Sequence, residues 1–278
     1  SVYYLHFHYI NLQQIDKLKD TEFNKKIYKN IKLHLNLFSK GRFVSYFSRV
    51  SMEDGKLSYN LFYPNKQKHL RDSSLINLIS SQGKCWGPMI YKNLRLYKTY
   101  YDYCLYPMII QEIKPLTIIE LGSGNGSSAI WMNDICKSIN LDTIIYSLEI
   151  HDIKKKLKEN KMIKSLLDIH FINGDAYKIE KYFPSELLNI LPHPWLIIED
   201  CHHNTFNIMN YFHNFLKKDD YMIIEDPDEI DTGNKELEGL SIIKFMQKHA
   251  QNYVVDVKYC DFFGKNNCSF PDSIFKYI

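Results

Sequence analysis

Between residues 117 and 224 the hydrophobic positions form short unbroken runs, separated by longer stretches in which they recur every three or four residues. Short apolar runs rich in β-branched residues are typical of buried strands, and the longer spacing is typical of helices that cover one face of a sheet. Strands and helices that alternate in this way build a mostly parallel sheet with helices on both sides. The pattern therefore predicts an α/β fold with a doubly wound, mostly parallel sheet.

The ends of the apolar runs set the boundaries of the predicted elements. The predicted strands of the sheet are 117–121, 143–148, 169–172, 195–198 and 221–224. The predicted helices of the same region are 100–113, 128–139, 153–166, 205–218 and 237–249. Two late segments, 253–259 and 270–275, also have strand patterns, and an antiparallel arrangement is open to them.

The first part of the chain has a different pattern. We expect residues 1–82 to form an accessory region on the substrate side and residues 83–278 to form the core domain. From Phe23 to Phe38 the apolar residues have helical spacing with lysines between them, which predicts a basic amphipathic helix. Residues 84–97, rich in aromatic residues, predict a loop that leads into the core domain.

Two strand-like segments of the accessory region flank a turn signal. Residues 42–50 and 57–63 alternate in the manner of strands, and Asp54-Gly55 lies between them. An Asp-Gly pair between two such segments favours a β-hairpin. Residues 72–81 predict a short helix after the hairpin.

A glycine-rich turn follows the first predicted strand of the sheet and leads into a helix. Its three glycines at alternate positions let the backbone turn sharply and leave no Cβ between it and a ligand. The helix that follows presents free N–H groups, and ligands of open α/β sheets bind beyond the carboxyl ends of the strands. We therefore expect a nucleotide-type cofactor here. The candidate contacts are Glu120, Gly122, Ser123, Gly124, Gly126 and Ser127.

The spacing of the turn separates two kinds of nucleotide site. A dinucleotide fingerprint is G-x-G-x-x-G, but here the third glycine is Gly126 and Ser127 stands where that glycine should be. Glu149 follows the second strand, 23 residues after Gly126 (149 − 126 = 23). An acid at this position can accept hydrogen bonds from both hydroxyls of a ribose.

Two later strands end in paired acids, Glu199-Asp200 and Glu225-Asp226. Neighbouring parallel strands lie about 4.8 Å apart, so we expect the two pairs to be neighbours in space. Four carboxylates would repel one another unless protons or a cation neutralised them. A divalent cation bound by oxygens from both strand ends, with Mg²⁺ as the expected ion, is one interpretation. Acids exposed at the starts of loops are the other.

Two segments resemble known methyltransferases. Thr117 to Ala129 resembles motif I of class I S-adenosylmethionine (SAM) methyltransferases. Residues 198–209, followed by 220–226, resemble the cephalosporin hydroxylase (CmcI-like) family, whose relatives include rhamnosyl O-methyltransferases. The similarity spans about residues 86 to 227. It implies a Rossmann-like class I methyltransferase fold with SAM as the cofactor.

The resemblance implies further cofactor contacts. Asp175, after the third strand, would contact the adenine amino group of SAM, although an ordinary Asp turn is the alternative at this position. Trp86 either lies over the cofactor or plugs the edge of the domain.

The resemblance also implies a metal site. In catechol-type and caffeoyl-CoA-type enzymes, one acid after strand four and two adjacent residues after strand five hold the metal. The interval 225 − 199 = 26 matches that pattern and selects Glu199 as the first ligand, with Asp200 as its competitor. Glu225 and Asp226 match the other two ligands. His202 falls where those enzymes carry a base, because an imidazole of near-neutral pKa can take a proton from a metal-bound hydroxyl; His203 is the second candidate.

Composition excludes some classes of protein. A net charge of +3 is too small to indicate nucleic acid as the main partner. The six cysteines form no C-x-x-C pair, which favours a reducing cytoplasm. No apolar run approaches about 18 residues, so we expect no membrane span. The oligomeric state is left open, a homo-oligomer included.

The function implied is SAM-dependent and divalent-metal-dependent methyl transfer to a hydroxyl of a small molecule, either a sugar or a natural product. Transfer to carbon or nitrogen in a biosynthetic pathway is the alternative. A hydroxylase ranks lower, because non-haem iron sites normally have two histidines and one carboxylate. A SAM-binding subunit without turnover is the alternative from outside the enzymes.

Overall fold

The computed structural model describes residues 42–49, 52–53, 56–57, 89–159, 168–227, 230–231, 236–264, 266 and 268–278. Several predictions lie outside these residues. They are the basic helix from Phe23 to Phe38, the strand at 57–63 after its first residue, the short helix at 72–81, the contact made by Trp86, and the second half of the helix at 153–166.

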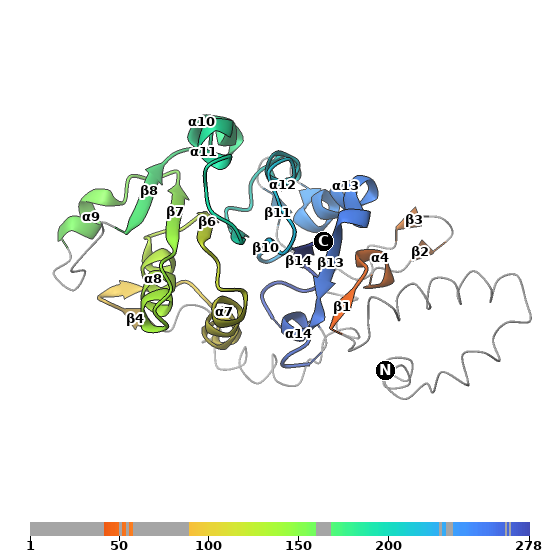
Figure 1. Ribbon diagram of the computed structural model, residues 1–278, viewed down its shortest axis with the longest axis horizontal. Helices are drawn as coiled ribbons and strands as arrows, with labels where there is room; N and C mark the ends of the chain where they lie inside the picture. Colours follow the sequence, from red (N-terminus) through yellow and green to blue (C-terminus); the bar gives the residue numbers. More distant parts are fainter. Residues whose placement is uncertain are drawn as a thin grey trace, which may run out of the picture.

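An eight-stranded mixed sheet forms the centre of the molecule (Figure 1). Its strand order is β1-β13-β14-β10-β9-β6-β7-β8, and the five strands from β10 to β8 are parallel. Of the two late strands, β14 runs antiparallel to β10, as predicted. β13 pairs antiparallel with β14 and so runs in the same direction as the five parallel strands. The bounds are β1 Phe43–Val44, β6 Thr117–Leu121, β7 Ile144–Glu149, β8 Ile169–Asn173, β9 Trp195–Glu199, β10 Tyr221–Ile224, β13 Tyr253–Asp256 and β14 Ile274–Tyr277.

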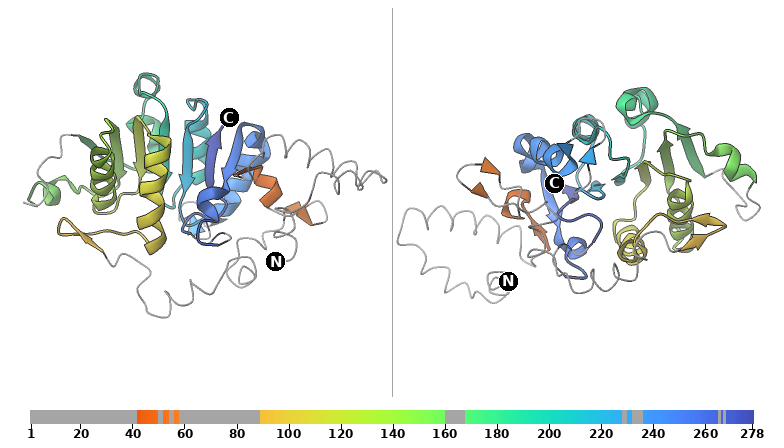
Figure 2. Two further views of the ribbon diagram at one scale, coloured as in Figure 1. Left: turned by 60° about the horizontal axis from the view of Figure 1, so that its bottom comes forward. Right: turned by 180° about the vertical axis from the view of Figure 1, so that it is seen from behind.

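Helices cover both faces of the sheet, which confirms the doubly wound α/β prediction. In Figure 1, α7, α8 and α14 lie below the sheet and α10, α11, α12 and α13 lie above it, and Figure 2 shows the same two layers from other sides. The bounds are α4 Tyr46–Arg49, α7 Tyr100–Ile113, α8 Ser127–Ser138, α9 Lys154–Glu159, α10 Ile179–Tyr182, α11 Ser185–Leu188, α12 Thr205–His213, α13 Glu238–His249, α14 Val257–Cys260, and the 3-10 turns η3 Ala176–Lys178 and η4 Ala250–Asn252.

Three short hairpins complete the described elements. β2 Met52–Glu53 pairs with β3 Lys56–Leu57 on either side of residues 54–55, so the turn signal was placed correctly. The predicted strand 42–50 is not part of this hairpin, because its residues 43–44 pair with β13. β4 Ile90–Tyr91 pairs with β5 Leu94–Arg95, and β11 Ile230–Asp231 pairs with β12 Glu236–Leu237. The β4–β5 hairpin lies within the segment 84–97, for which the sequence predicted a loop.

Complete burial explains why β6, β9 and β10 are unbroken apolar runs. Every residue of these three strands is buried. Strands enclosed on both faces lose the alternation of apolar and polar residues that half-exposed strands show. Trp195 at the start of β9 is fully enclosed in the core.

The strand predicted at 270–275 begins later, because β14 spans Ile274–Tyr277. Three further predicted boundaries were wrong, and polar side chains account for each of these. Residues 46–49 form α4 instead of a strand, and Arg49 is buried where it binds Asp261 and Asp272. The strand predicted at 253–259 stops at Asp256, whose side chain accepts the N–H of Lys258 and caps α14. α12 ends at His213 instead of Lys218, and Asp220 accepts the N–H of Lys217 in the turn that follows.

Residues 42–49 belong to the core of the described structure, because they include the edge strand β1 of the main sheet. β1 pairs with β13, and Arg42 binds Asp256 and Glu112. The boundary proposed between residues 82 and 83 stays a prediction. Among the described residues, no helix is long and apolar enough to cross a membrane.

Candidate functional site

The carboxyl ends of β6, β9 and β10 lie side by side, as predicted. Leu121 and Ile224 both pair with Glu199, the last residue of the strand between them. The ladder continues one residue further, because Asp200 donates its N–H to Leu121 O at 2.9 Å and Glu225 donates its N–H to Glu199 O at 2.9 Å. The glycine turn and both pairs of acids therefore meet at one edge of the sheet.

Gly122 allows the glycine turn to touch the end of β9. Its φ is +89°, and a Cβ at this position would lie 2.4 Å from the carbonyl oxygen of Asp200. No side chain larger than hydrogen fits there without moving the chain at Asp200. Gly124 also has a positive φ, and its N–H donates to Glu149 Oε2 at 2.8 Å. The turn is thus fixed on one side by β9 and on the other by Glu149.

Gly126 and Ser127 have structural contacts. A Cβ on Gly126 would lie 2.9 Å from Ile153 and 3.0 Å from Phe171, so this glycine lets α8 pack closely on its neighbours. The hydroxyl of Ser127 donates to the carbonyl of Arg95 at 2.8 Å, which fastens the β4–β5 hairpin to the turn. Neither residue lines the cavity described next.

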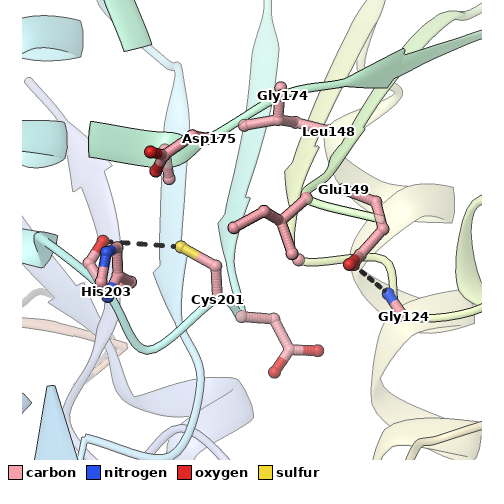
Figure 3. Close-up of a pocket in the computed structure, with 11 residues that line it drawn as sticks. Gly124, Leu148, Glu149, Gly174, Asp175, Cys201 and His203 are labelled. Atoms are coloured by element: carbon pink, nitrogen blue, oxygen red, sulfur yellow. Dashed lines mark hydrogen bonds between the residues drawn. The ribbon is translucent and has the colours of Figure 1, made fainter. Parts of the chain in front are cut away.

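A cavity of about 370 Å³ opens above the turn (Figure 3). Figure 3 shows Glu149 and Gly124 at one side of it, Asp175 and His203 at the other, and Cys201 between them. The cavity thus brings together six of the predicted site residues from four strand ends. Its lining consists of Gly122, Gly124, Leu148, Glu149, Ile150, Gly174, Asp175, Ala176, Asp200, Cys201 and His203.

Glu120 and Ser123, two predicted cofactor contacts, are not part of that lining. Glu120 is fully buried, and one of its oxygens accepts a hydrogen bond from Ser147 at 3.1 Å. Burial raises the pKa of its carboxyl. Glu120 Oε1 and Ser123 Oγ have no hydrogen-bond partner among the described residues.

Asp200, His202 and Asp226 form a group that could hold a metal ion. Each offers one ligand atom, and these atoms all lie within 4.8 Å of one another. His202 and Asp226 adopt left-handed backbone conformations, with φ of 51° and 43°. Such conformations are uncommon for residues other than glycine, although Asp and His adopt them more often than most. Burial, followed by the charges of Glu225 and Asp200, raises the pKa of Asp226 to about 8.

Glu238 positions the ring of His202. The Nδ1 atom of His202 lies 3.2 Å from Glu238 Oε1, and its Nε2 atom lies 3.6 Å from Asp200 Oδ1. Metal-binding histidines commonly donate their other ring N–H to a carboxylate in this way. The arrangement therefore suits His202 as an ion ligand through Nε2.

The carboxylate of Glu199 is not part of this candidate ion group and is hydrogen-bonded to other protein groups. It is fully buried and accepts hydrogen bonds from the N–H of Cys201 at 3.3 Å and the hydroxyl of Thr205 at 3.2 Å. Burial, followed by the charge of Glu238, raises the pKa of Glu199 to about 8. Consecutive residues of a strand point to opposite faces, so Glu199 and Asp200 cannot share one direction. The interval of 26 that selected Glu199 also separates Asp200 from Asp226 (226 − 200 = 26), and the structure brings that second pair together.

Glu225 is paired with a lysine that the sequence analysis did not select. Lys98 Nζ lies 2.6 Å from Glu225 Oε1 and 2.6 Å from Asp200 Oδ2. The phenol of Tyr106 also donates to Glu225. Burial lowers the pKa of Lys98, but the two carboxylates outweigh burial and hold that pKa well above its usual value. A permanent positive charge therefore lies among the acids.

A second cavity of about 370 Å³ lies beyond His203. Its lining combines aromatic rings, amides, a hydroxyl and a lysine, contributed by Tyr177, Asn204, Phe206, Asn207, Ser241 and Lys244. The rings of Tyr177 and His203 pack edge to face with centroids 3.9 Å apart. Because His203 lines the first cavity and Tyr177 the second, this ring pair separates the two.

Two solved structures of CmcI have a similar fold. The apo structure of CmcI is 24% identical with a TM-score of 0.56, over 69% of this chain and 77% of that chain. A structure of CmcI with magnesium and SAM is 22% identical with a TM-score of 0.55, over 88% of this chain and 95% of that chain. These similarities establish the fold.

The fold, the glycine turn and the cavity above it define the class of protein as a SAM-dependent methyltransferase. The chain belongs to the rhamnosyl O-methyltransferase/CmcI family, whose model matches residues 84–259, more than half of the sequence. No curated protein sequence matched the chain.

Proposed function

We propose that the protein transfers the methyl group of SAM to a hydroxyl of a small molecule, with a divalent ion beside the acceptor. The position of Asp200 carries this proposal. Its carbonyl oxygen lies against Gly122, the residue lines the first cavity, and its carboxylate belongs to the candidate ion group. One residue thus joins the proposed cofactor pocket to the proposed ion site.

The first cavity fits SAM in size and in polar groups. Its volume of about 370 Å³ lies in the range of small-molecule sites. Gly124 leaves open space, because a Cβ there would meet only Tyr97, at 3.9 Å. Glu149 would accept hydrogen bonds from the ribose hydroxyls, and Asp175 would accept one from the adenine amino group. The two side chains lie at opposite sides of the cavity (Figure 3).

The donor set of the ion group fits a divalent cation. Two carboxylates supply the oxygens that Mg²⁺ and Mn²⁺ prefer, whereas the one imidazole also suits softer ions such as Fe²⁺ or Zn²⁺. We propose Mg²⁺ as the ion, held by Asp200, His202 and Asp226. When bound, SAM would supply an electrophilic methyl group, and the ion would supply positive charge that makes an acceptor hydroxyl more acidic.

The proton of the acceptor needs a base that faces the cavity. Of the two histidines selected from the sequence, His202 is held by Glu238 and faces Asp200, whereas His203 lines the cavity itself. We therefore assign His202 to the ion and His203 to proton removal. Tyr177 fixes the ring of His203 by edge-to-face packing, which preserves its direction.

The second cavity supports a polyhydroxylated acceptor, such as a sugar or a glycosylated natural product. Aromatic faces pack on the apolar side of a sugar ring, and amides and hydroxyls exchange hydrogen bonds with its polar groups. Tyr177 and Phe206 supply the former, and Asn204 and Asn207 the latter.

A hydroxylase is the weaker interpretation of the same site. Non-haem iron oxygenases use two histidines and one carboxylate, whereas the candidate group here has one histidine and two carboxylates. Oxygen consumption in the presence of Fe(II) would support the hydroxylase interpretation against ours.

Calorimetry of SAM binding with and without MgCl₂ tests the proposal. We expect wild type to bind SAM and the Asp200→Asn variant to lose the effect of Mg²⁺. The exposed Asp168, which pairs with Lys137 outside the site, gives a matched control in Asp168→Asn. SAM binding unaffected by Mg²⁺ in wild type would contradict the ion assignment.

A panel of rhamnosides and other glycosides, with SAM and Mg²⁺, tests the reaction itself. Mass spectrometry should find the gain of one methyl group on oxygen, lost with EDTA and restored by Mg²⁺. Methylation on nitrogen or carbon would overturn the acceptor assignment and leave the cofactor assignment intact.

A further inference from the structure

We propose that Lys98 is a positioning residue of the ion site. Its ammonium group binds Glu225 Oε1 and Asp200 Oδ2, so that only Asp200 Oδ1, His202 and Asp226 are left to bind the ion. This inference rests on the proposed function, because it presupposes that the group of Asp200, His202 and Asp226 binds a divalent cation. It adds a fixed positive charge to a site that the sequence predicts from acids alone.

The contacts of Lys98 are short and enclosed. Its Nζ lies 2.6 Å from both Asp200 Oδ2 and Glu225 Oε1, and the side chains of Lys98 and Glu225 are 2% and 4% exposed. The ammonium also lies 5.5 Å from the centroid of the Tyr106 ring, within the range of a cation–π contact. Lysines are seldom buried unless they are paired, so the two carboxylates stabilise the buried ammonium while the ammonium fixes the two carboxylates.

The two oxygens of Asp200 have different partners. Oδ2 accepts from Lys98, whereas Oδ1 faces Nε2 of His202 at 3.6 Å. Lys98 therefore fixes which oxygen of Asp200 is turned toward the ion group. A carboxylate held at one oxygen presents the other in a defined direction, which a metal site of fixed geometry requires.

The backbone beside Lys98 is held in place. Thr99 is the N-cap of α7, and it forms a capping box with Asp102. The hydroxyl of Ser269 also donates to Asp102, which joins this helix start to the segment before β14. Lys98 thus directly precedes a capped helix start whose hydrogen bonds fix the backbone beside it.

The charge of Lys98 should weaken the binding of a divalent ion. A cation bound at Oδ1 of Asp200 and an ammonium bound at Oδ2 repel each other in a poorly solvated site. Replacing Lys98 by an uncharged residue frees the carboxylate of Asp200 to rotate, but it also removes that repulsion and releases Glu225 as a further ligand. We expect these two gains to exceed the loss of a fixed direction. Replacing Glu225 alone leaves the ammonium uncompensated. The two substitutions should therefore change ion affinity in opposite directions.

Titration with Mn²⁺, followed by the electron paramagnetic resonance signal of the free ion, measures the ion affinity of each variant without any turnover. We expect Lys98→Met to lower the dissociation constant of Mn²⁺ about ten-fold, and Glu225→Gln to raise it about ten-fold. The double variant Lys98→Met/Glu225→Gln should return close to wild type. It replaces a buried ion pair with uncharged groups of similar volume, a change that folded proteins tolerate.

The double variant decides between two roles of Glu225. If Glu225 were itself an ion ligand, the double variant would lack that ligand and bind Mn²⁺ clearly more weakly than wild type, and the inference would be overturned. It would also be overturned if Lys98→Met bound Mn²⁺ no more tightly than wild type. Should Lys98→Met not fold, the double variant still separates the two roles.

Two further results keep this inference distinct from the proposed function. Lys92→Met removes a lysine paired with Asp134 outside the site, and its Mn²⁺ affinity should equal that of wild type. Wild type that binds no Mn²⁺ would overturn the ion site and this inference together. Wild type that binds Mn²⁺ with an affinity insensitive to Lys98 would overturn this inference alone.

Discussion

Glu238 and His202 are joined by a hydrogen bond between Oε1 and Nδ1, with the two atoms 3.2 Å apart. Glu238 is fully buried at the first position of α13, and His202 follows β9 in a left-handed conformation. Because Nδ1 is taken by the carboxylate, Nε2 is the ring atom left to face Asp200. Glu238, which lies 36 residues further along the chain, therefore sets the direction of the His202 ring.

Replacing Glu238 should weaken ion binding although Glu238 is not itself a ligand. Without the carboxylate, the ring of His202 is free to rotate and its basicity falls. We expect Glu238→Ala to weaken Mn²⁺ binding about 10- to 100-fold, the range seen for such supporting carboxylates. Paramagnetic resonance of free Mn²⁺ measures the loss. Glu180→Gln, at an exposed glutamate of α10, is the control; an unchanged affinity in Glu238→Ala would remove Glu238 from the site.

Two of the acids predicted as metal ligands, Glu199 and Asp226, should behave differently. Glu199 bonds to Cys201 and Thr205 and has a pKa raised to about 8 by burial, so glutamine imitates its protonated form. We expect Glu199→Gln to change Mn²⁺ affinity by less than about threefold, and Asp226→Asn to weaken it by about 100-fold. Thermal unfolding of both variants checks that each is folded. A large loss in Glu199→Gln alone would restore Glu199 as the first ligand.

The sheet was predictable because its signals are local. The apolar runs of β6, β9 and β10 stop at glycine or acid residues, and parallel pairing then brings their carboxyl ends together. The positions of the glycine turn, Glu149 and Asp175 around one cavity follow from that topology.

The directions of the acids were not predictable by counting. An interval of 26 fits Glu199 with Glu225 and equally fits Asp200 with Asp226, and only the pleat of the strands separates the two pairs. Lys98 gave no signal either, because it lies 102 residues before Asp200 and precedes an ordinary helix. Its role depends on a tertiary contact between the start of α7 and the ends of β9 and β10.

Alanine at two glycines of the turn should have separable effects. At Gly122 a Cβ would lie 2.4 Å from the carbonyl oxygen of Asp200, so Gly122→Ala should destabilise the fold by about 3 kcal/mol and displace the ion site. At Gly124 the space is open, and only the left-handed backbone costs about 1 kcal/mol. Gly124→Ala should therefore stay folded and lose SAM affinity, because the methyl group projects at the cavity edge.

Thermal unfolding and SAM calorimetry together check this pair of glycine variants. The expected pattern is a large drop in melting temperature with Gly122→Ala and a small one with Gly124→Ala. Equal drops would mean that the contact between Gly122 and Asp200 is looser than described. Unchanged SAM binding in Gly124→Ala would count against the first cavity as the cofactor pocket.

Glu112 should link folding stability to acid pH. On α7 it accepts from Arg42, Lys258 and Tyr259, and although partial burial opposes the shift, these partners lower its pKa from 4.5 to about 2. A carboxylate whose pKa is lower in the folded state contributes stability above its unfolded pKa and loses it as pH falls toward the folded value. Glu112→Gln should therefore have a lower melting temperature than wild type at pH 7. The gap should narrow as the pH falls below 4.5, whereas the exposed Glu186→Gln should show no such gap. A gap that is constant with pH would mean that packing, and not charge, gives Glu112 its effect.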